Sequence, residues 1–256
     1  MRPDFYTNTR KKLASLLNAV RVRIHSAEIK DLSARYDLNQ LQKFQAILER
    51  NGFLLSQFSS ILDFGCRSGR HSAQLLKVLP NAQIYGCDIS KEHIEQCRKK
   101  YPRGRFVQNN VKPPIDFADS QFDFIYSYSV FTHLTEHNHR QWLRELSRIL
   151  KPGGVMLHTT HSYECLFRLQ FWTPESLNKY KLPKPVAEFT VPEVQYRYAL
   201  DREATPEYGN SIISQGYVIK HWPVYSQSRI VEYVVGAIEA YPEGCQDVVL
   251  MRKPLG

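Results

Sequence analysis

The chain has 256 residues, which is enough for one α/β domain with additions at its ends, and no run of about 18 apolar residues could span a membrane. Its 34 Lys and Arg residues against 25 Asp and Glu give a formal net charge of +9. This charge favours acidic partners such as nucleic acid, anionic lipid or a phosphorylated or carboxylated small molecule, although a solvated basic surface explains it equally well. The five cysteines form no CxxC pair or zinc spacing, and the N-terminus lacks the apolar segment of a signal peptide, so we expect a cytoplasmic protein with reduced thiols.

Residues 1–30 predict a basic amphipathic helix, because apolar residues recur there at helical spacing among seven Lys and Arg residues. Three roles fit this pattern: a cap over a ligand site, a partner or dimer surface, and a helix that lies on a membrane. The cap is favoured because small domains more often use such an apolar stripe as core. A second helix is predicted over residues 37–51, with Asn51-Gly52 as its stop signal.

Residues 61–72 predict a strand, a glycine-bearing turn and the start of a helix. An α/β sheet holds a nucleotide-type ligand in this way, because Gly65 and Gly69 let the backbone approach the ligand and the helix N-terminus offers unpaired N–H groups. A second strand over residues 81–87 ends in Asp88, about where a βαβ unit places the acidic residue that binds ribose hydroxyls.

The next part of the chain alternates between strands and helices, which predicts a parallel sheet with helices on both faces. The predicted elements are a helix at 90–101, a strand at Arg105–Gln108, a loop at Asn109–Pro114, a strand at Phe122–Ser127, a helix that contains Trp142, a turn at Leu150–Gly154 and a strand that begins at Val155.

After His161 the pattern changes to one that is rich in tyrosine, proline and charge. Short strands are predicted at Val194–Leu200 and Ser211–Ser214, and a final antiparallel hairpin is predicted from Arg229–Val235 and Asp247–Arg252. No repeat or low-complexity linker is present, so we predict a single domain. Its parts are a helical N-terminal cap (1–55), a ligand-binding core (56–161), an insertion (162–222) and C-terminal strands (223–256).

Four motifs in this order resemble the class I S-adenosylmethionine-dependent methyltransferases. They are Asp63-x-Gly65-x-x-x-Gly69, Asp88, Phe122-Asp123-Phe124-Ile125 and Leu150-Lys151-Pro152-Gly153-Gly154, and the resemblance covers roughly residues 55–160. It implies a Rossmann-like, doubly wound, mostly parallel seven-stranded sheet with a C-terminal antiparallel hairpin, an N-terminal helical cap and an insertion after the fifth strand that commonly builds the acceptor site. It also implies S-adenosyl-L-methionine as the cofactor.

The resemblance assigns roles to residues at the cofactor. Gly65 and Gly69 would line the methionine part, and Asp63 would help to hold the methionine ammonium directly or through water. Ser127, at the end of the fourth strand, belongs to the same expected set.

Asp88 would accept hydrogen bonds from both ribose hydroxyls, with Ile89 next to it at the cofactor. The alternative role of Asp88 is a helix N-cap shared with Ser90, and its place at the carboxyl end of a strand favours the ribose contact.

Two positions depart from the family pattern. Arg67 stands where the family usually has a second glycine or another small residue, so its guanidinium either reaches the cofactor carboxylate or obstructs the site. Asn110 stands where the family often has an aspartate for the adenine amino group, and its amide oxygen can still accept that hydrogen bond while Val111 packs on the ring.

Two histidines follow the fourth and fifth predicted strands, at the edge where the methyl group must be presented. His133 is the favoured general base for an acceptor hydroxyl, and His161, with Tyr163 beside it, is the second candidate. His133 fits equally well as a residue that caps the following helix or touches the cofactor. His158 lies inside a strand and is expected to be structural.

Several motifs that are absent from the sequence reduce the number of methyl-transfer reactions that fit it. No Asn-Pro-Pro-Tyr or Asp-Pro-Pro-Tyr motif stands at residues 127–130, which argues against the exocyclic amines of DNA bases, and no Pro-Cys pair is present for the cysteine mechanism at pyrimidine C5. Ser127 stands where the catechol-type relatives carry a carboxylate metal ligand, so no metal is expected.

These observations predict a metal-independent methyl transfer to an oxygen or nitrogen of a small molecule or a glycan. The segments Ser129–Leu134, Gln141–Leu146 and Gln246–Leu250 are similar to bacterial methyltransferases of glycan and natural-product pathways. Two rival hypotheses stay open. The charge of the chain permits an RNA methyltransferase, and Arg67 permits a protein that binds the cofactor without catalysis.

Overall fold

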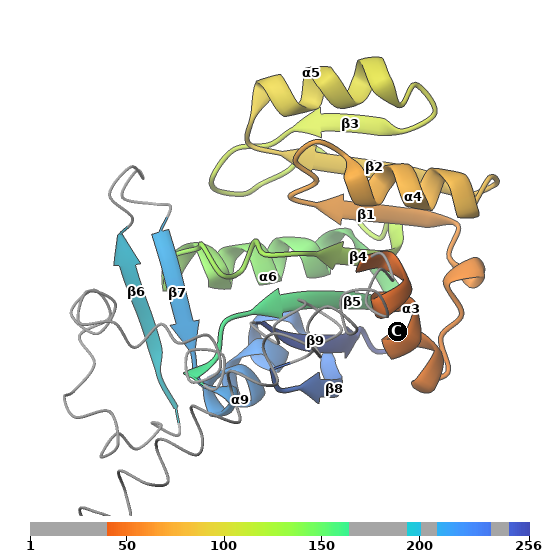
Figure 1. The fold of residues 1–256 in the computed structure, drawn as a ribbon. Coiled ribbons are helices and arrows are strands. Elements are labelled where there is room, and N and C mark those ends of the chain that lie inside the picture. Colours follow the sequence, from red (N-terminus) through yellow and green to blue (C-terminus); the bar gives the residue numbers. More distant parts are fainter. Residues whose placement is uncertain (1–39, 164–193, 201–208, 237–245) are drawn as a thin grey trace, which may run out of the picture. The chain divides into compact units, whose positions relative to one another are not determined.

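The computed structural model describes residues 40–163, 194–200, 209–236 and 246–256 (Figure 1). The chain divides into two compact units, Met1–Asn39 and Gln40–Gly256, and every described residue belongs to the second. The predicted basic helix of residues 1–30 lies outside the described residues. The single domain proposed from the sequence therefore stays a prediction.

A seven-stranded sheet forms the centre of the described unit, in the order β3-β2-β1-β4-β5-β9-β8 (Figure 1). The first five strands in the chain pair in parallel, whereas β9 pairs antiparallel with both β5 and β8. This arrangement confirms the predicted mostly parallel sheet with a C-terminal antiparallel pair. The strands are β1 (Ser60–Phe64), β2 (Gln83–Asp88), β3 (Arg105–Gln108), β4 (Phe122–Ser127), β5 (Leu150–Thr160), β8 (Arg229–Val234) and β9 (Asp247–Arg252).

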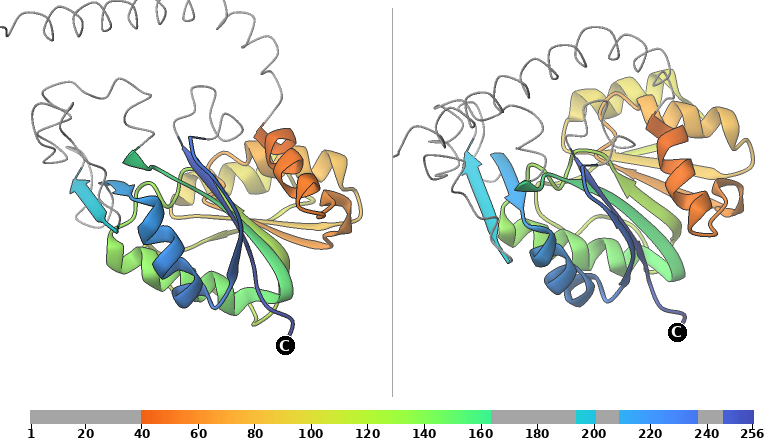
Figure 2. Two further views of the ribbon diagram at one scale, coloured as in Figure 1. Left: turned by 90° about the horizontal axis from the view of Figure 1, so that it is seen from below. Right: turned by 60° about the horizontal axis from the view of Figure 1, so that its bottom comes forward.

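Helices cover both faces of this sheet, because side chains alternate between the two faces along each buried strand (Figure 2). Ile61 of β1 packs in an apolar cluster with α3 and α4, whereas its neighbour Leu62 packs in the opposite cluster with α6 and α9. The helical elements are α3 (Gln40–Arg50), the short 3₁₀ helix η2 (Leu55–Gln57), α4 (Arg70–Val78), α5 (Lys91–Lys100), α6 (Glu136–Ile149) and α9 (Gln215–Ser226).

Helix α9 lies at the end of the region that we predicted as an insertion. It begins after Ser214, whose side chain accepts a hydrogen bond from the Tyr217 backbone N–H, and it buries Trp222 in the core shared with α6. The sequence did not predict this helix, because Pro223 lies inside it and proline is a strong signal against a helix interior.

The predicted turn at Leu150–Gly154 is wrong, because β5 already begins at Leu150. Phe122 of β4 pairs with Leu150, but Phe124 pairs with Val155, so the Pro-Gly-Gly segment is accommodated as an irregularity within the β4–β5 pairing. Gly153 has a φ of +76°, a conformation that glycine adopts without strain. A sequence signal that is typical of turns therefore lies inside a strand.

A separate two-stranded antiparallel sheet contains β6 (Tyr196–Leu200) and β7 (Gly209–Ile213). Both strands were predicted, at Val194–Leu200 and Ser211–Ser214, but their pairing partners were not. Within the described ranges, no helix has the length and apolar character needed to cross a membrane. Cys66, Cys87 and Cys97 are buried and unpaired, whereas the other two cysteines lie outside the described residues.

Candidate active site

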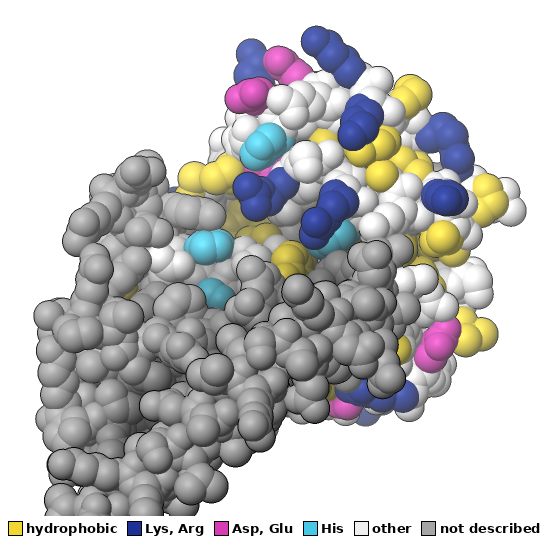
Figure 3. All heavy atoms as spheres, viewed as in Figure 1, with side chains coloured by type: hydrophobic (Ala, Val, Ile, Leu, Met, Phe, Trp, Pro, Cys, Tyr) yellow, Lys and Arg dark blue, Asp and Glu magenta, His cyan; other side chains and the backbone are white. Residues whose placement is uncertain are grey.

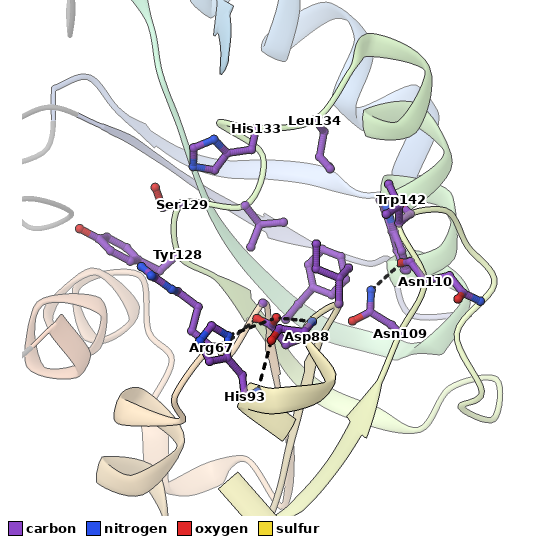
Figure 4. Close-up of a pocket in the computed structure, with 16 residues that line it drawn as sticks. Arg67, Asp88, His93, Asn109, Asn110, Tyr128, Ser129, His133, Leu134 and Trp142 are labelled. Atoms are coloured by element: carbon purple, nitrogen blue, oxygen red, sulfur yellow. Dashed lines mark hydrogen bonds and ion pairs between the residues drawn. The ribbon is translucent and has the colours of Figure 1, made fainter. Parts of the chain in front are cut away.

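A pocket of about 550 Å³ opens at the carboxyl ends of β1, β2, β3 and β4 (Figure 4). One part of its wall comes from the loops after β1, β2 and β3, which we call the Asp88 side. The opposite part comes from the β4–α6 loop, residues 128–135, which we call the His133 side. In Figure 4, Arg67, Asp88 and His93 lie on the first side, and His133 and Leu134 lie on the second.

The turn after β1 requires glycine at the pocket. Gly65 has a φ of +81°, and a Cβ added there would lie 2.3 Å from Cγ2 of Val130 in the β4–α6 loop. Gly69 has a φ of +72°, is the N-cap residue of α4 and leaves no room for a side chain beside Cys97. Gly65 thus lets the turn pass close to the β4–α6 loop, whereas Gly69 packs beside Cys97 of α5 and does not line the pocket. The predicted contact of the two glycines with the methionine part stays a prediction.

The carboxylate of Asp88 is held by two backbone amides. Its Oδ2 accepts a hydrogen bond from the Arg67 N–H, and its Oδ1 accepts one from the Ser90 N–H, both at 2.9 Å. Ser90 is the N-cap residue of α5, so the two alternative roles of Asp88 are compatible: the aspartate orients the cap and still faces the pocket. Each carboxylate oxygen can accept a further hydrogen bond, which leaves capacity for two hydroxyl donors.

Arg67 enters the pocket wall from a strained backbone. Its φ is +46°, in the left-handed region that disfavours residues with a Cβ. Its side chain is exposed, and among the described residues it has no hydrogen-bond or ion-pair partner for its guanidinium. A guanidinium in this state can bind an anionic group of a ligand.

The loop after β3 places an amide oxygen in the wall. Nδ2 of Asn109 donates to the Asn110 carbonyl at 2.8 Å, while its Oδ1 is buried without a partner. Asn110, the residue predicted from the sequence, also lines the pocket but is exposed. Nε1 of Trp142 donates to the Val111 carbonyl at 2.9 Å and holds this loop in place. Sequence reasoning missed Asn109, and the one signal for it is its position directly after β3.

The side chain of Asp63 lies under the turn and points to α4. It is 2% exposed, and its Oδ2 accepts a hydrogen bond from the Ser72 hydroxyl at 2.7 Å. Burial raises the pKa of Asp63, although the neighbouring His71 and the Ser72 hydroxyl favour the charged form. Its predicted contact with an ammonium group stays a prediction.

Ser127 is fully buried, and its hydroxyl is hydrogen-bonded to Nδ1 of His158 at 2.8 Å. Its side chain therefore lies in the core, and only its backbone could meet the predicted cofactor role. His158 is equally buried, as expected for a structural residue, and burial lowers its pKa to about 3.

The structure brings the two candidate histidines together. His133 lines the pocket, and its Nδ1 lies 2.8 Å from the Gly209 carbonyl oxygen. Because a carbonyl only accepts, this contact favours the neutral tautomer that carries its proton on Nδ1. His161 does not line this pocket, and burial, with His133 nearby, lowers its pKa to about 4.

Comparison with known proteins identifies the core of this unit. Residues 61–154 match a family model described as a methyltransferase domain. Residues 61–154 thus form a methyltransferase domain of the class I S-adenosylmethionine-dependent type. The matched segment runs from β1 into β5 and includes Gly65, Asp88 and His133.

Two curated methyltransferases match part of the chain. A trans-aconitate 2-methyltransferase of Azoarcus sp. (strain BH72) is 30% identical over 102 residues, which are 40% of this chain and 39% of that protein. A tRNA (carboxymethyluridine(34)-5-O)-methyltransferase of Arabidopsis thaliana is 32% identical over 154 residues, which are 58% of this chain and 36% of that protein. The alignment thus spans well under half the length of either relative.

A solved methyltransferase structure shares the fold over most of the chain. The 1,6-didemethyltoxoflavin-N1-methyltransferase of Burkholderia thailandensis, solved with bound 1,6-didemethyltoxoflavin and S-adenosylhomocysteine, superposes with a TM-score of 0.57. The two chains are 14% identical, and the match covers 95% of this chain and 90% of that one. At this identity, the likeness shows the fold alone.

The pocket fits the cofactor that membership in this family implies. Asp88 offers acceptor capacity suited to ribose hydroxyls, and the unpartnered buried oxygen of Asn109 suits an amino group such as that of adenine. Bound S-adenosylmethionine would supply a methyl group on a sulfonium. Separately, the described residues contain no group of three or more His, Cys, Asp or Glu side chains that could hold a metal ion.

Proposed function

We propose that this methyltransferase transfers the methyl group of S-adenosylmethionine to an oxygen or nitrogen of a small molecule or a glycan, without a metal ion. The observation that supports this most strongly is a single pocket with Asp88 on one side and His133 on the other. A carboxylate suited to ribose and a histidine suited to proton transfer thus border the same space.

The Asp88 side binds and orients the cofactor. Asp88 accepts from the ribose hydroxyls, Asn109 accepts from the adenine amino group, and Arg67 binds the carboxylate of the methionine part. Holding donor and acceptor in reactive geometry can lower the barrier by about 7 to 11 kcal/mol, so binding on this side is itself a large part of catalysis.

The His133 side removes the proton of the acceptor. With Nδ1 protonated by its bond to the Gly209 carbonyl, Nε2 of His133 takes the proton from an acceptor hydroxyl as the oxygen bonds to the methyl group. The O–H bond breaks, the O–C bond forms, and the electron pair of the broken S–C bond stays on sulfur. A positioned base of this kind is worth about 10² to 10⁴ in rate.

Charge favours an acidic acceptor. The chain carries a net charge of +9, which attracts anionic molecules to its surface. The relative from Azoarcus is by its name a methyltransferase of trans-aconitate, which supports small carboxylated acceptors as the class to test first.

RNA is the second candidate substrate, because one relative is a tRNA methyltransferase and the chain is basic. Figure 3 shows Lys and Arg side chains scattered over the surface near α4 and α5, and Arg98, Lys99 and Lys100 end α5. A solvated basic surface gives the same picture, so the salt dependence of RNA binding has to decide.

One experiment separates these possibilities. The purified chain is titrated with S-adenosylmethionine by calorimetry and then incubated with a panel of small carboxylic acids, sugars and bulk tRNA while S-adenosylhomocysteine is measured. We expect saturable cofactor binding and turnover that depends on a small acceptor. Turnover with tRNA alone would support the RNA enzyme, and binding without any turnover would support a non-catalytic protein.

A further inference from the structure

Strand β7 is hydrogen-bonded to both segments that carry the candidate histidines. The Gly209 N–H donates to the His133 carbonyl at 3.0 Å, and the Ser211 N–H donates to the Thr132 carbonyl at 2.8 Å. Farther along the same strand, the Ile213 N–H donates to the His161 carbonyl at 2.8 Å. These three hydrogen bonds tie β7 to the His133 side of the pocket and to the residue after β5, although β7 belongs to a different sheet.

Gly209 holds His133 by two hydrogen bonds, one through the backbone and one through the ring. Besides its N–H bond to the His133 carbonyl, its own carbonyl accepts from Nδ1 of the ring at 2.8 Å. A Cβ at Gly209 would lie 2.4 Å from the Ala199 carbonyl oxygen and 2.8 Å from the Tyr198 ring. Glycine is therefore required for the close pairing of β6 with β7 that puts this carbonyl beside the ring.

The rest of the β4–α6 loop is held just as firmly. The Ser211 hydroxyl donates to the Phe131 carbonyl, the Tyr196 hydroxyl donates to the Leu134 carbonyl, and Nε2 of Gln246 donates to the Ser129 hydroxyl. These bonds fix the loop that carries His133, and the ring itself is held by its hydrogen bond to the Gly209 carbonyl, which it would have to break in order to turn. The ring orientation is thus set by the β6–β7 hairpin.

We propose that Gly209 is a positioning residue: its carbonyl keeps the proton of neutral His133 on Nδ1 and leaves Nε2 as the basic nitrogen toward the acceptor. In a neutral imidazole, the hydrogen bond made by one nitrogen decides which nitrogen carries the proton. The hairpin therefore selects the tautomer that can act as a base. This inference rests on the proposed function only in the step from tautomer to catalysis.

The tautomer can be measured without any acceptor. The full chain is labelled with ¹⁵N-histidine, and the ring of His133 is assigned by comparison with the His133→Asn variant, at a pH where the ring is neutral. Two-bond couplings from the ring carbon protons distinguish the two nitrogens. We expect Nδ1–H to predominate, whereas Nε2–H or an even mixture in the wild-type chain would overturn the proposal.

The Gly209→Ala variant tests whether this residue selects the tautomer. It should convert the ring to a mixture and lower kcat by about tenfold or more, because the base then spends part of its time in the wrong form. Cofactor affinity should stay within a few-fold, which a general loss of structure would not allow. An unchanged tautomer together with an unchanged kcat would overturn the proposal.

The two claims fail in different ways. If His133 has the Nδ1–H tautomer but His133→Asn retains full turnover, the positioning by Gly209 stands and the proposed base is wrong. Asparagine is the suitable variant because its amide nitrogen can take the place of Nδ1 and keep donating to the Gly209 carbonyl, while no group replaces Nε2.

Discussion

The two sides of the pocket are held together over very different sequence distances. On the Asp88 side, the carboxylate accepts from Arg67 and Ser90, which lie 21 and 2 residues away. On the His133 side, the ring bonds to a carbonyl 76 residues away, and Ser129 accepts from a side chain 117 residues away. Local motifs therefore build the first side, whereas distant segments of the chain assemble the second.

This difference explains why the Asp88 side can be predicted from the sequence more easily than the His133 side. A strand, a turn and a helix in sequence put Gly65 and Asp88 at the same sheet edge in any chain of this topology. The partner of His133 depends on a hairpin whose strands belong to another sheet.

The largest effect is expected at the base. His133→Ala should lower kcat by about 10² or more once an acceptor is known, because an alcohol is a poor nucleophile until it begins to lose its proton. The acidic limb of the pH–rate profile should vanish in this variant, and cofactor affinity should stay within a few-fold. Steady-state kinetics over a range of pH, with calorimetry, measure both.

The matched control for this variant is His137→Ala, an exposed histidine on α6 that should leave the rate unchanged. If His161→Ala gives the pattern expected of His133→Ala, the roles of the two histidines are exchanged. If neither variant loses more than about tenfold, positioning alone carries the reaction and the acceptor atom needs no base, as for an amine that is neutral when bound or a carboxylate oxygen.

Asp88→Ala should weaken cofactor binding by about 1.5 to 3 kcal/mol, the scale of hydrogen bonds to a charged group. It should also destabilise the fold, because the Arg67 and Ser90 amides lose their acceptor. Asp88→Asn keeps one oxygen and separates the two effects. Calorimetry and denaturant unfolding of both variants provide the test, and an unchanged affinity would remove the ribose assignment.

Acid should destabilise the His133 side through His158, which is buried beneath it. The pKa of His158 is lowered to about 3 in the fold, against about 6.5 in an unfolded chain, so the unfolded state binds the proton first as the pH falls. His158 alone then lowers the free energy of unfolding by about 2 kcal/mol between pH 7 and pH 5, and the buried His139 and His161, whose pKa values are also lowered, add to this loss. Denaturant unfolding at the two pH values measures this.

The loss of unfolding free energy between pH 7 and pH 5 should be smaller by about 2 kcal/mol in His158→Gln than in the wild-type chain. In His137→Gln, which changes an exposed histidine, this loss should equal that of the wild-type chain. Asp63 contributes with the opposite sign, because its raised pKa means that the folded state binds its proton first. An equal drop in all three proteins would show that His158 is not the group responsible.

Asn109→Ala should weaken cofactor binding by about 1 kcal/mol, the usual worth of one hydrogen bond. The matched variant Asn110→Ala should have almost no effect, because its side chain is exposed whereas the Asn109 oxygen is buried and unpartnered. Calorimetry with S-adenosylmethionine measures both. The reverse ranking would restore Asn110 as the adenine contact predicted from the sequence.

The smallest effect is expected at Arg67. Arg67→Gly should lower cofactor affinity by about 1 kcal/mol or less, since the side chain is exposed and its charge is screened by water. The same variant should raise the free energy of unfolding by about 1 kcal/mol, because glycine tolerates the positive φ at this position. Tighter cofactor binding would instead mean that Arg67 obstructs the site.

The sequence predicted most of the sheet and the cofactor motif, and its failures have physical causes. The strand boundaries follow from short apolar runs, so Phe122–Ser127 and Asp247–Arg252 were found with their bounds. Helix α9 was missed because of Pro223, and the start of β5 was misplaced because Pro-Gly-Gly normally marks a turn.

A site residue could be predicted from the sequence where its type and its position relative to a strand are enough to place it at the pocket. Asp88 and His133 meet that condition, since Asp88 ends β2 and His133 follows β4 at the edge where ligands bind. Asn109 was passed over for its neighbour, because a one-residue shift after a strand reverses which side chain is buried. No sequence pattern could have indicated Gly209, because its contribution is a backbone carbonyl brought in by tertiary pairing.

The central claim is that a cofactor held at Asp88 presents its methyl group to His133. Nuclear Overhauser measurements on the chain bound to S-adenosylmethionine with a ¹³C-labelled methyl group test this most directly. We expect contacts from the methyl protons to the ring protons of His133, and their loss in His133→Ala while the cofactor stays bound. A bound cofactor whose methyl group shows contacts to other residues but none to His133 would contradict the claim.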